Sequence, residues 1–470
     1  MKTLFTMNSK KSYLRNTIAL CFLFLSCHIS SAQCWSTISS GGRHTLGIKT
    51  NGTLWGWGWN LYGQLGDGTN TDKNTPVQID TATNWSKLAT GWTHVLAIKT
   101  DGTLWTWGRN NYGQLGDSTL IDKNTPMQIG TDTNWAQVSA GSDFAVALKT
   151  DGTFWGWGRN NYGQLGDGTI INKLVPTQTD TSTNWSHISG GFIHVMALKS
   201  DSTLWCWGNN TYGQIGDGTV VHKYIPVQVG IANDWTFISG GGFHSQAIKS
   251  NGTLWAWGAN GDGQLGDGTN FGKTLPTAIG TDTNWSKISS GREHNLALKN
   301  DGTLWTWGDN MYGQLGDGTI LDKWAPAQIG AANDWIFVEG GAHQSLAIKA
   351  GGSLWSWGYN IYGQLGEGSN TDKTLPTFVS SPGCSPTEIS SVNENDNDLL
   401  IFPNPVQNYL TVQTNNFTAE KIIISNLMGE KVLETTITNS PINAEQLPNG
   451  IYIVSVFAKN KIHQFKIIKL

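Results

Sequence analysis

The stretch WGWGWNLYGQLGDGT, residues 55–69, decides the fold because close copies of it return along the chain at a fixed step. Its paired tryptophans recur, 50 residues apart, at 55/57, 105/107, 155/157, 205/207, 255/257, 305/307 and 355/357. A third tryptophan precedes each pair by 20 residues, from Trp35 to Trp335. Seven copies from about residue 35 to about residue 380 indicate a repeat architecture in which each unit packs on its neighbours.

Each unit is predicted to form four short strands, which we name A to D. In the first copy they are expected at 35–39, 44–49, 53–58 and 76–80. Asn51-Gly52 between strands B and C favours a tight hairpin, because both turn residues need a positive φ. Seven four-stranded units predict an all-β fold, a seven-bladed β-propeller, whose ring closure protects the sheet edges.

Composition agrees with short strands and excludes one class of partner. The 470 residues include 58 glycines and 24 tryptophans. Side chains alternate along a strand, so Trp55 and Trp57 share one side of strand C, and we expect all fourteen paired tryptophans to be core residues. The chain has 30 basic and 34 acidic residues, which leaves no positive field for a polyanion, so no nucleic-acid partner is expected.

The repeat also resembles that of a known family. Trp57-Gly58-x-Asn60-x-Tyr62-Gly63-Gln64-Leu65-Gly66, preceded by Gly41-x-x-His44, is similar to the repeat of the regulator of chromosome condensation family. The likeness covers residues 35–380 and implies a seven-bladed propeller. The departures from the motif are few: Gly261-Asp262 in copy five, Ile215 in copy four, and Phe144 and Gln344 in place of the histidine.

The N-terminus predicts export. Residues 1–32 combine basic residues at 10, 11 and 15, an apolar run at 18–25 and the small residues Ser30-Ser31-Ala32, as in a secretory signal peptide. No transmembrane segment is expected in the mature chain. The propeller is assigned to residues 33–384 and a polar linker to residues 385–398.

The C-terminus changes pattern. Residues 399–470 alternate without the 50-residue repeat and predict a small β-sandwich with strands at 410–412, 421–425, 451–456 and 464–468. The motifs at 402–405, 426–429, 447–452 and 466–470 together resemble the C-terminal sorting domain of type IX secretion. That resemblance implies the type IX secretion machinery as a partner and a secreted or cell-surface location.

Three cysteines remain after the signal peptide. Cys34 and Cys384 are 350 residues apart, seven steps of 50, so one turn of the ring should bring them together in a disulfide, unless they are two unrelated thiols. Cys206 replaces a small residue between two tryptophans, and we expect an inert buried thiol there.

Repeated polar residues are assigned to structure. The histidines at the start of strand B are expected to hydrogen-bond a turn, because side chains at one radius of a ring do not converge on a metal. Lys73 and its six counterparts are expected to pair with Asp67 and its counterparts, or else to form a cationic ring for an anionic glycan. The oxygen-rich run 67–72 changes too freely between copies for a calcium site. We expect no metal, no cofactor and no enzymatic activity.

A binding site is expected where the copies differ. The A–B turns and C–D loops share one face of the ring, which we call the variable face, and the B–C turns and D–A connections form the uniform face. Aromatic and arginine side chains typical of interface anchors occur in the variable set. The candidates are Trp59, Trp92, Arg109, Arg159, Phe192, Tyr224, Phe243, Arg292, Trp324 and Tyr359.

The candidates favour binding of an extracellular protein, since the resembled family includes secreted bacterial inhibitors that cap an enzyme with a propeller face. Its nuclear members exchange guanine nucleotides and bind chromatin, partners that an exported chain does not meet. A lectin that binds a glycan is the alternative. A hydrolase would need Asp143, Glu293 or Asp309, which we expect on separate blades. Neutral variation of exposed loops also stays open.

Overall fold

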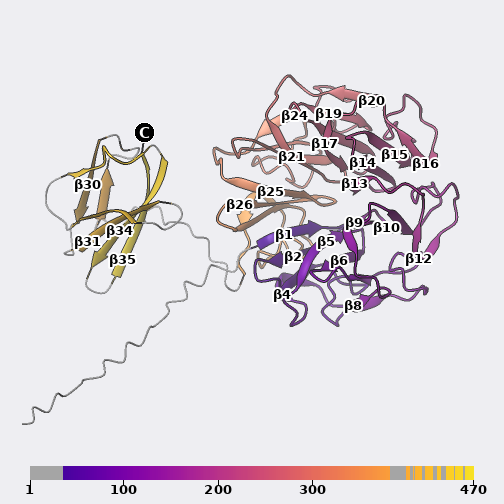
Figure 1. Ribbon diagram of the computed structural model, residues 1–470, viewed down its shortest axis with the longest axis horizontal. Coiled ribbons are helices and arrows are strands. Elements are labelled where there is room, and N and C mark those ends of the chain that lie inside the picture. The colour runs from indigo at the N-terminus through magenta and orange to yellow at the C-terminus, as the bar shows by residue number, and fades with distance from the viewer. Residues whose placement is uncertain are drawn as a thin grey trace, which may run out of the picture. The chain divides into compact units, whose positions relative to one another are not determined.

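The computed structural model describes residues 35–381 and, in the C-terminal part, residues 399–402, 406, 408–414, 419–426, 431–435, 441–448, 450–458 and 461–469. These residues form strands and loops, and seven four-stranded sheets surround a centre (Figure 1). The predicted fold, a seven-bladed propeller followed by a small C-terminal β-sandwich, is confirmed. The signal peptide, the linker and both ends of the predicted Cys34–Cys384 disulfide lie outside the described residues.

Each blade is one antiparallel sheet of four consecutive strands, in the order A-B-C-D. Blade 1 consists of β1 (Trp35–Ser40), β2 (His44–Lys49), β3 (Leu54–Gly58) and β4 (Lys73–Gln78). Blade 2 consists of β5 (Trp85–Thr90), β6 (His94–Lys99), β7 (Leu104–Gly108) and β8 (Lys123–Gln128). Blade 3 consists of β9 (Trp135–Ala140), β10 (Phe144–Lys149), β11 (Phe154–Gly158) and β12 (Lys173–Gln178). Blade 4 consists of β13 (Trp185–Gly190), β14 (His194–Lys199), β15 (Leu204–Gly208) and β16 (Lys223–Gln228).

The remaining blades keep the same lengths. Blade 5 consists of β17 (Trp235–Gly240), β18 (His244–Lys249), β19 (Leu254–Gly258) and β20 (Lys273–Ala278). Blade 6 consists of β21 (Trp285–Ser290), β22 (His294–Lys299), β23 (Leu304–Gly308) and β24 (Lys323–Gln328). Blade 7 consists of β25 (Trp335–Gly340), β26 (Gln344–Lys349), β27 (Leu354–Gly358) and β28 (Lys373–Phe378).

The predicted bounds of strands A to C are right to within one residue, but those of strand D are wrong. Strand D of blade 1 begins at Lys73, three residues before the predicted start, and ends at Gln78. Gly58 pairs with Lys73, so the ladder begins where strand C ends, and a bulge follows before Gly56 pairs with Val77. Residues expected in the C–D loops therefore belong to the outermost strands.

Blades are joined through the second tryptophan of each pair. Trp107 is completely buried, and its indole N–H donates to the Gln64 carbonyl of the preceding blade at 3.0 Å. The second tryptophan of each pair is a core residue as predicted, whereas the first is only half-buried and packs at the edge of the core in blades 2 to 7. Trp55 is half-buried near the uniform face, where it donates to Thr53 Oγ1 at 2.9 Å and lies 3.9 Å below the Lys49 ammonium.

Backbone hydrogen bonds confirm which connections share a face. Trp59 N donates to Arg43 O at 2.9 Å, which ties the start of a C–D loop to an A–B turn. Trp85 N donates to Gly52 O at 3.1 Å, which ties the start of strand A in one blade to the B–C turn of the blade before. The variable and uniform faces are thus opposite ends of the ring.

The ring closes without exchanging a strand, since every blade is built from consecutive strands. Blade 7 meets blade 1 through a backbone contact used at other junctions, Ala342 N to Gly41 O at 3.2 Å, although the Trp57 indole N–H there has no hydrogen-bond partner in the described part of the chain. Gln344 Nε2, which replaces the usual histidine, donates to Ser40 Oγ at 2.9 Å. Among the described residues, closure therefore rests on noncovalent contacts.

The C-terminal part is a two-sheet sandwich. One sheet contains β29 (Leu399–Phe402), β30 (Tyr409–Thr414) and β33 (Ile442–Asn443). The other contains β32 (Lys431–Thr435), β31 (Ala419–Asn426), β34 (Gly450–Ala458) and β35 (Lys461–Lys469) in that order. Its core joins Leu410 of the first sheet to Ile424 and Val454 of the second.

The predicted disulfide is testable, because noncovalent closure leaves the ends of the ring free to separate. We expect intact mass under denaturing, non-reducing conditions to show Cys34 and Cys384 bonded and only Cys206 free. Replacing both by serine should lower the stability of the propeller, by on the order of 5 kcal/mol in the chain-entropy estimate for so long a loop. Three free thiols in the secreted protein would contradict the prediction.

Candidate functional site

The centre of the variable face is a ring of A–B turns joined by their backbones. Gly42 N donates to Trp92 O at 3.3 Å, Ser142 N to Phe192 O at 2.9 Å, and Gly242 N to Arg292 O at 3.0 Å. The chain of bonds continues through blade 7 back to Gly41. Because the backbone groups are paired with each other, the side chains of these turns are left to form the surface of the channel mouth.

Four of the predicted anchors meet at this mouth. The Trp92 and Phe192 rings lie edge to face with centroids 5.3 Å apart, and Phe192 and Phe243 lie 5.9 Å apart. The Arg292 guanidinium is 5.9 Å from the Trp92 ring. These residues come from blades 2, 4, 5 and 6 and are half-buried against one another. We call them the mouth cluster.

In blades 1, 2, 3 and 7 the first residue of the C–D loop stacks on the tyrosine of the preceding blade. Arg109 lies 4.6 Å from the Tyr62 ring, and Arg159 lies 5.0 Å from the Tyr112 ring. Trp59 lies 5.7 Å from Tyr362 and Tyr359 lies 4.6 Å from Tyr312 by the same rule. Blades 1 to 3 therefore carry an aromatic and basic ledge, to which Arg43 adds a third guanidinium, 5.1 Å from the Tyr362 ring.

Two predicted anchors lie in strand D and not in a loop. Tyr224 and Trp324 are the second residues of β16 and β24, the outermost strands of blades 4 and 6. They pack against Gly163 and Gly263 of the neighbouring blades, although each stays more than 40% exposed. They lie beside the C–D loops of those blades, where Gly168 N donates to Tyr224 O at 2.9 Å and Gly268 N donates to Trp324 O at 2.8 Å, and they stay candidate anchors at the outer rim.

The acidic residues lie differently from the prediction. Glu293 and Asp309 belong to one blade, not two, and their carboxylates lie with the His343 ring within a span of 4.8 Å. Asp309 already accepts from Met311 N at 3.0 Å and from Gln314 Nε2 at 2.5 Å, so little of its coordination capacity is free. Asp143 is apart from them and pairs with Arg159 at 3.3 Å.

Asp262 completes this acidic patch from blade 5, where the other copies have tyrosine. Burial, reinforced by the charges of Glu293 and Asp309, raises the pKa of Asp262 to about 6. The departures from the repeat at blades 5 and 6 thus meet in space and give the variable face a negative sector.

The tips of the C–D loops carry apolar side chains that sequence reasoning missed. The exposed residues are Leu120, Ile121, Ile170, Ile171, Val220, Val221, Phe271, Ile320 and Leu321, which are 56–72% exposed. They belong to blades 2 to 6, and we call them the apolar arc. Blades 1 and 7 have Asn-Thr instead, and Asn70 folds back to donate to Leu61 O at 2.8 Å.

A buried asparagine under each loop explains why these side chains point outward. In blade 3, Asn160 Nδ2 donates to Thr169 O at 3.1 Å and to Ile171 O at 3.2 Å, and its Oδ1 accepts from Leu165 N at 2.9 Å. The asparagine therefore holds the tip by its carbonyl groups, and the side chains of Ile170 and Ile171 have no interior to enter.

The repeated charges, and the histidines of blades 4 to 6, have structural partners. Lysine at the start of strand D pairs with the loop carboxylate in every blade, from 2.7 Å for Lys223–Asp217 to 3.7 Å for Lys373–Glu367, as predicted. His194 Nε2 lies 2.9 Å from Ser245 Oγ, so its hydrogen bond crosses to the next blade rather than closing a turn. Burial lowers the pKa of His194 to about 3. Cys206 is fully buried, as expected, and burial raises its pKa.

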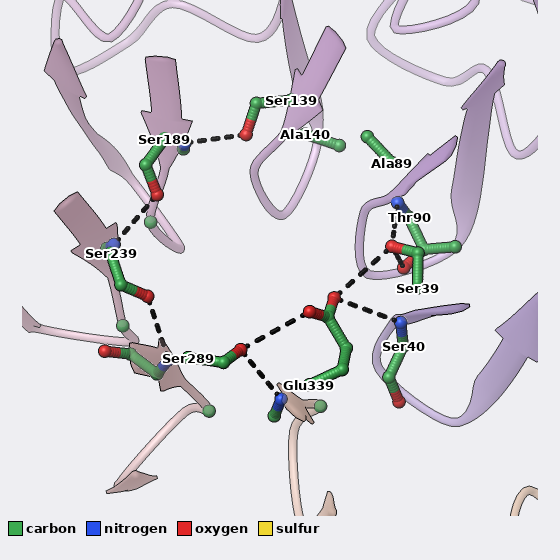
Figure 2. Close-up of a pocket in the computed structure, with 18 of the residues that line it drawn as sticks. Ser39, Ser40, Ala89, Thr90, Ser139, Ala140, Ser189, Ser239, Ser289 and Glu339 are labelled. Carbon is green, nitrogen blue, oxygen red and sulfur yellow. Dashed lines mark hydrogen bonds between the residues drawn. The ribbon is translucent and has the colours of Figure 1, made fainter. Parts of the chain in front are cut away.

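The channel behind the mouth cluster is a second polar site. It encloses about 520 Å³ and is lined by strand A of every blade. Figure 2 shows hydroxyl groups around it, where Ser139 Oγ accepts from Gly190 N at 2.8 Å and Ser189 Oγ accepts from Gly240 N at 3.0 Å. Each bond links one blade to the next.

One carboxylate interrupts this ring of hydroxyls. Glu339 stands where the other blades have serine or alanine, and its nearest donors are Ser39 Oγ at 3.4 Å, Ser289 Oγ at 3.4 Å and Ser40 N at 3.5 Å. It lies deep in the ring, although its side chain faces the lumen. Burial raises the pKa of Glu339 to about 7, because the weak hydrogen bonds, which lower the pKa, offset only part of the effect of burial. A comparison of the copies at this position would have found it.

Comparison with known proteins finds matching family models for both the propeller and the C-terminal part of the chain. Residues 125–394 match the family model of the RCC1-like domain, and residues 51–98 and 101–148 match the regulator of chromosome condensation (RCC1) repeat. Residues 35–64 and 85–114 match a second model of that repeat, and residues 400–470 match the secretion system C-terminal sorting domain. The crystal structure of human WBSCR16 has the same fold, with a TM-score of 0.64 and 22% identity, covering 70% of this chain and 94% of that one.

Similarity to curated proteins is confined to short segments. The ultraviolet-B receptor UVR8 of Arabidopsis thaliana is 52% identical over 44 residues, 9% of this chain and 10% of the receptor. The ulvan lyase NLR42 of Nonlabens ulvanivorans is 39% identical over 72 residues, 14% of either chain. The chain therefore spans 10% and 14% of the length of these two relatives, and neither activity carries over.

The ionisation of Glu339 should make stability depend on pH. Its pKa rises from an ordinary 4.5 in the unfolded chain to about 7 in the fold, so its contribution is full below 4.5 and is lost as pH rises through 7. Glu339→Gln should therefore change the free energy of unfolding little at pH 4, and raise it by on the order of 1 kcal/mol at pH 8, since lumen water relieves part of the burial. Chemical denaturation at both pH values measures this, and an equal effect at the two would contradict it.

Proposed function

The chain belongs to the RCC1-like domain family, and on that premise we propose that it is an exported propeller that binds another extracellular protein through its variable face. The C-terminal sorting domain is the signal for type IX secretion to the cell surface or the medium. Among the described residues no helix is long and apolar enough to cross a membrane. In this proposal residues 1–32 are the signal peptide, 33–384 the binding propeller, 385–398 the linker and 399–470 the sorting domain.

The observation that carries the proposal is the apolar arc. Five consecutive blades each hold at least one large apolar side chain more than half exposed at the tip of the C–D loop. Scattered exposed apolar residues are ordinary, but a series at one position along a rim is typical of a surface that another protein covers. The scaffold does not require it, since blades 1 and 7 build the same loop with Asn-Thr.

The mouth cluster and the ledge supply the other parts of an interface. Tryptophan, tyrosine and arginine carry much of the free energy of protein association, and here they are braced by stacking before a partner arrives. Bracing lowers the conformational entropy that is lost on binding. The mouth cluster therefore forms the centre of the proposed interface and the apolar arc forms its rim.

The charged residues of the variable face are divided between a basic sector and an acidic sector. The ledge on blades 1 to 3 carries Arg43, Arg109 and Arg159, while Asp262, Glu293 and Asp309 lie on blades 5 and 6. Opposite charges at two sectors favour one orientation of a partner and speed its association. The partner expected from this arrangement has an apolar contact surface with an acidic sector and a basic sector.

The alternatives fit the same face less well. Carbohydrate offers no large aliphatic surface to match the apolar arc, and the lysines proposed for an anionic glycan are each held by a loop carboxylate. Hydrolysis would draw on the acidic patch, where Asp309 is already hydrogen-bonded to its own loop. A protein partner, by contrast, would contact the apolar arc, the mouth cluster and the ledge together.

The test is capture of a protein from the native medium by residues 33–384. Changing Ile121, Ile171, Val221 and Leu321 together to threonine copies the residue of blades 1 and 7, so the fold is kept. We expect this variant to lose the captured protein by at least tenfold, because apolar area at the rim is removed. Ile231→Thr on the uniform face, where Ile231 is 98% exposed, is the matched control and should capture as the parent does.

Equal capture by the parent and the fourfold variant would overturn the proposal for the apolar arc. Alanine at Trp59, Trp92, Phe192 and Phe243 is the second arm, with thermal unfolding measured in parallel because these rings also pack on one another. Capture lost in the Ile231→Thr variant alone would assign the interface to the uniform face.

A further inference from the structure

The central channel has features that the ring of blades does not need. The serine hydroxyl oxygens that surround it help to hold the blades together, because each accepts a hydrogen bond from a backbone N–H of the next blade. The hydroxyl protons of Ser139, Ser189 and Ser239 are left to donate, and they face a cavity of about 520 Å³. That volume is within the range of small-molecule sites in proteins.

Glu339 places a carboxylate hydrogen-bond acceptor at a position where most blades have serine. Serine at this position in five of the blades shows that the ring is complete without a carboxylate. The nearest hydrogen-bond donors to Glu339 are 3.4–3.5 Å away, and none of the described basic side chains forms an ion pair with it. A carboxylate that is desolvated and weakly bonded costs stability, so its presence indicates a group that binds there.

The wall nearer the uniform face is aromatic. Phe237, Lys287 and Phe337 occupy the same position of strand A in blades 5, 6 and 7 and line the cavity. Phe337 and Glu339 are two residues apart on β25 and face the lumen together. Lys287 Nζ donates to Ile336 O at 2.6 Å, which fixes the ammonium at the wall and leaves two of its N–H groups.

We propose that this channel binds a small neutral saccharide, a mono- or disaccharide. Hydroxyl donors and a carboxylate acceptor on one ring suit a ligand whose own hydroxyls both donate and accept. Phenylalanine rings suit the apolar C–H face of a pyranose, which they shield from water. The charged side chains of the lining are Lys287, Arg292 and Glu339, and Arg292 pairs with Glu293 at 3.7 Å, so the lining does not favour a charged ligand.

The deep part of this site is distinct from the apolar arc. Glu339, Phe237 and Phe337 lie inside the channel, whereas the apolar arc lies at the outer tips of the C–D loops. Trp92, Phe192 and Arg292 line the mouth of this channel, so a partner protein on the mouth cluster would cover the channel entrance. The two proposals still rest on different side chains, so either can fail without the other.

The experiment is saturation-transfer NMR, followed by calorimetry, with the secreted propeller and a panel of glucose, galactose, mannose, xylose, cellobiose and lactose. At least one sugar should bind with a dissociation constant of about 1 mM or tighter. Glucuronate and glucosamine, which place a charge on a similar ring, should bind more weakly than their neutral counterparts.

Variants copied from other blades keep the fold testable. Glu339→Ser restores the usual residue of the ring, and Phe237→Thr with Phe337→Thr copies Thr37 of blade 1. Each should weaken the sugar at least tenfold while the melting temperature is kept or raised, and protein capture by the variable face should be unchanged. The control Ile171→Thr, outside the channel, should leave sugar binding intact.

Three outcomes would overturn the proposal. The first is no saturable binding of any neutral sugar in the panel. The second is binding that survives both Glu339→Ser and the double phenylalanine variant, which would locate the sugar elsewhere. The third is tighter binding of glucuronate or glucosamine than of the neutral sugars, which would assign the channel to a charged ligand.

Discussion

The contact on which the whole ring depends is the buried indole between neighbouring blades. Trp107 has no exposed surface, and its N–H donates to Gln64 O of the blade before it. Gly66 of that blade lies against the same ring with a φ of +80°, a backbone conformation and a closeness that a side chain would not allow. The junction therefore needs a large buried ring, a hydrogen bond to its indole N–H and a glycine with a left-handed backbone. Because the junctions share these needs, the sequence motif repeats with little change.

Because these buried contacts hold the blades together, the exposed loop tips are not needed for the fold. Once the indole, the buried asparagine and the lysine–carboxylate pair have fixed each loop, the residues at its tip are free to vary. The seven blades therefore serve as internal controls for one another. Where some blades differ from others, as at Asp262, Glu339 or the apolar arc, the difference is not explained by the fold, because blades without these residues fold in the same way.

Much of this organisation could be predicted from the sequence, because the period of 50 fixes which residues are equivalent. Blade number, strand order, the two faces and the Lys73–Asp67 pairs follow from that register. Strand D begins earlier than predicted, because Lys73 already pairs with Gly58 before the bulge, so Tyr224 and Trp324 lie in strands and not in loops. The meeting of Asp262 with Glu293 across two blades depends on how the blades pack, which a linear pattern does not contain.

We have proposed that the tips of the variable face bind another protein. The most direct measurement is photo-crosslinking of the secreted chain in its native surroundings, with a photoreactive phenylalanine analogue placed at residue 171 or at residue 231, two exposed apolar positions on opposite faces. We expect a discrete protein adduct from position 171 and none from position 231. Adducts from position 231 alone, or the same pattern from both, would contradict it.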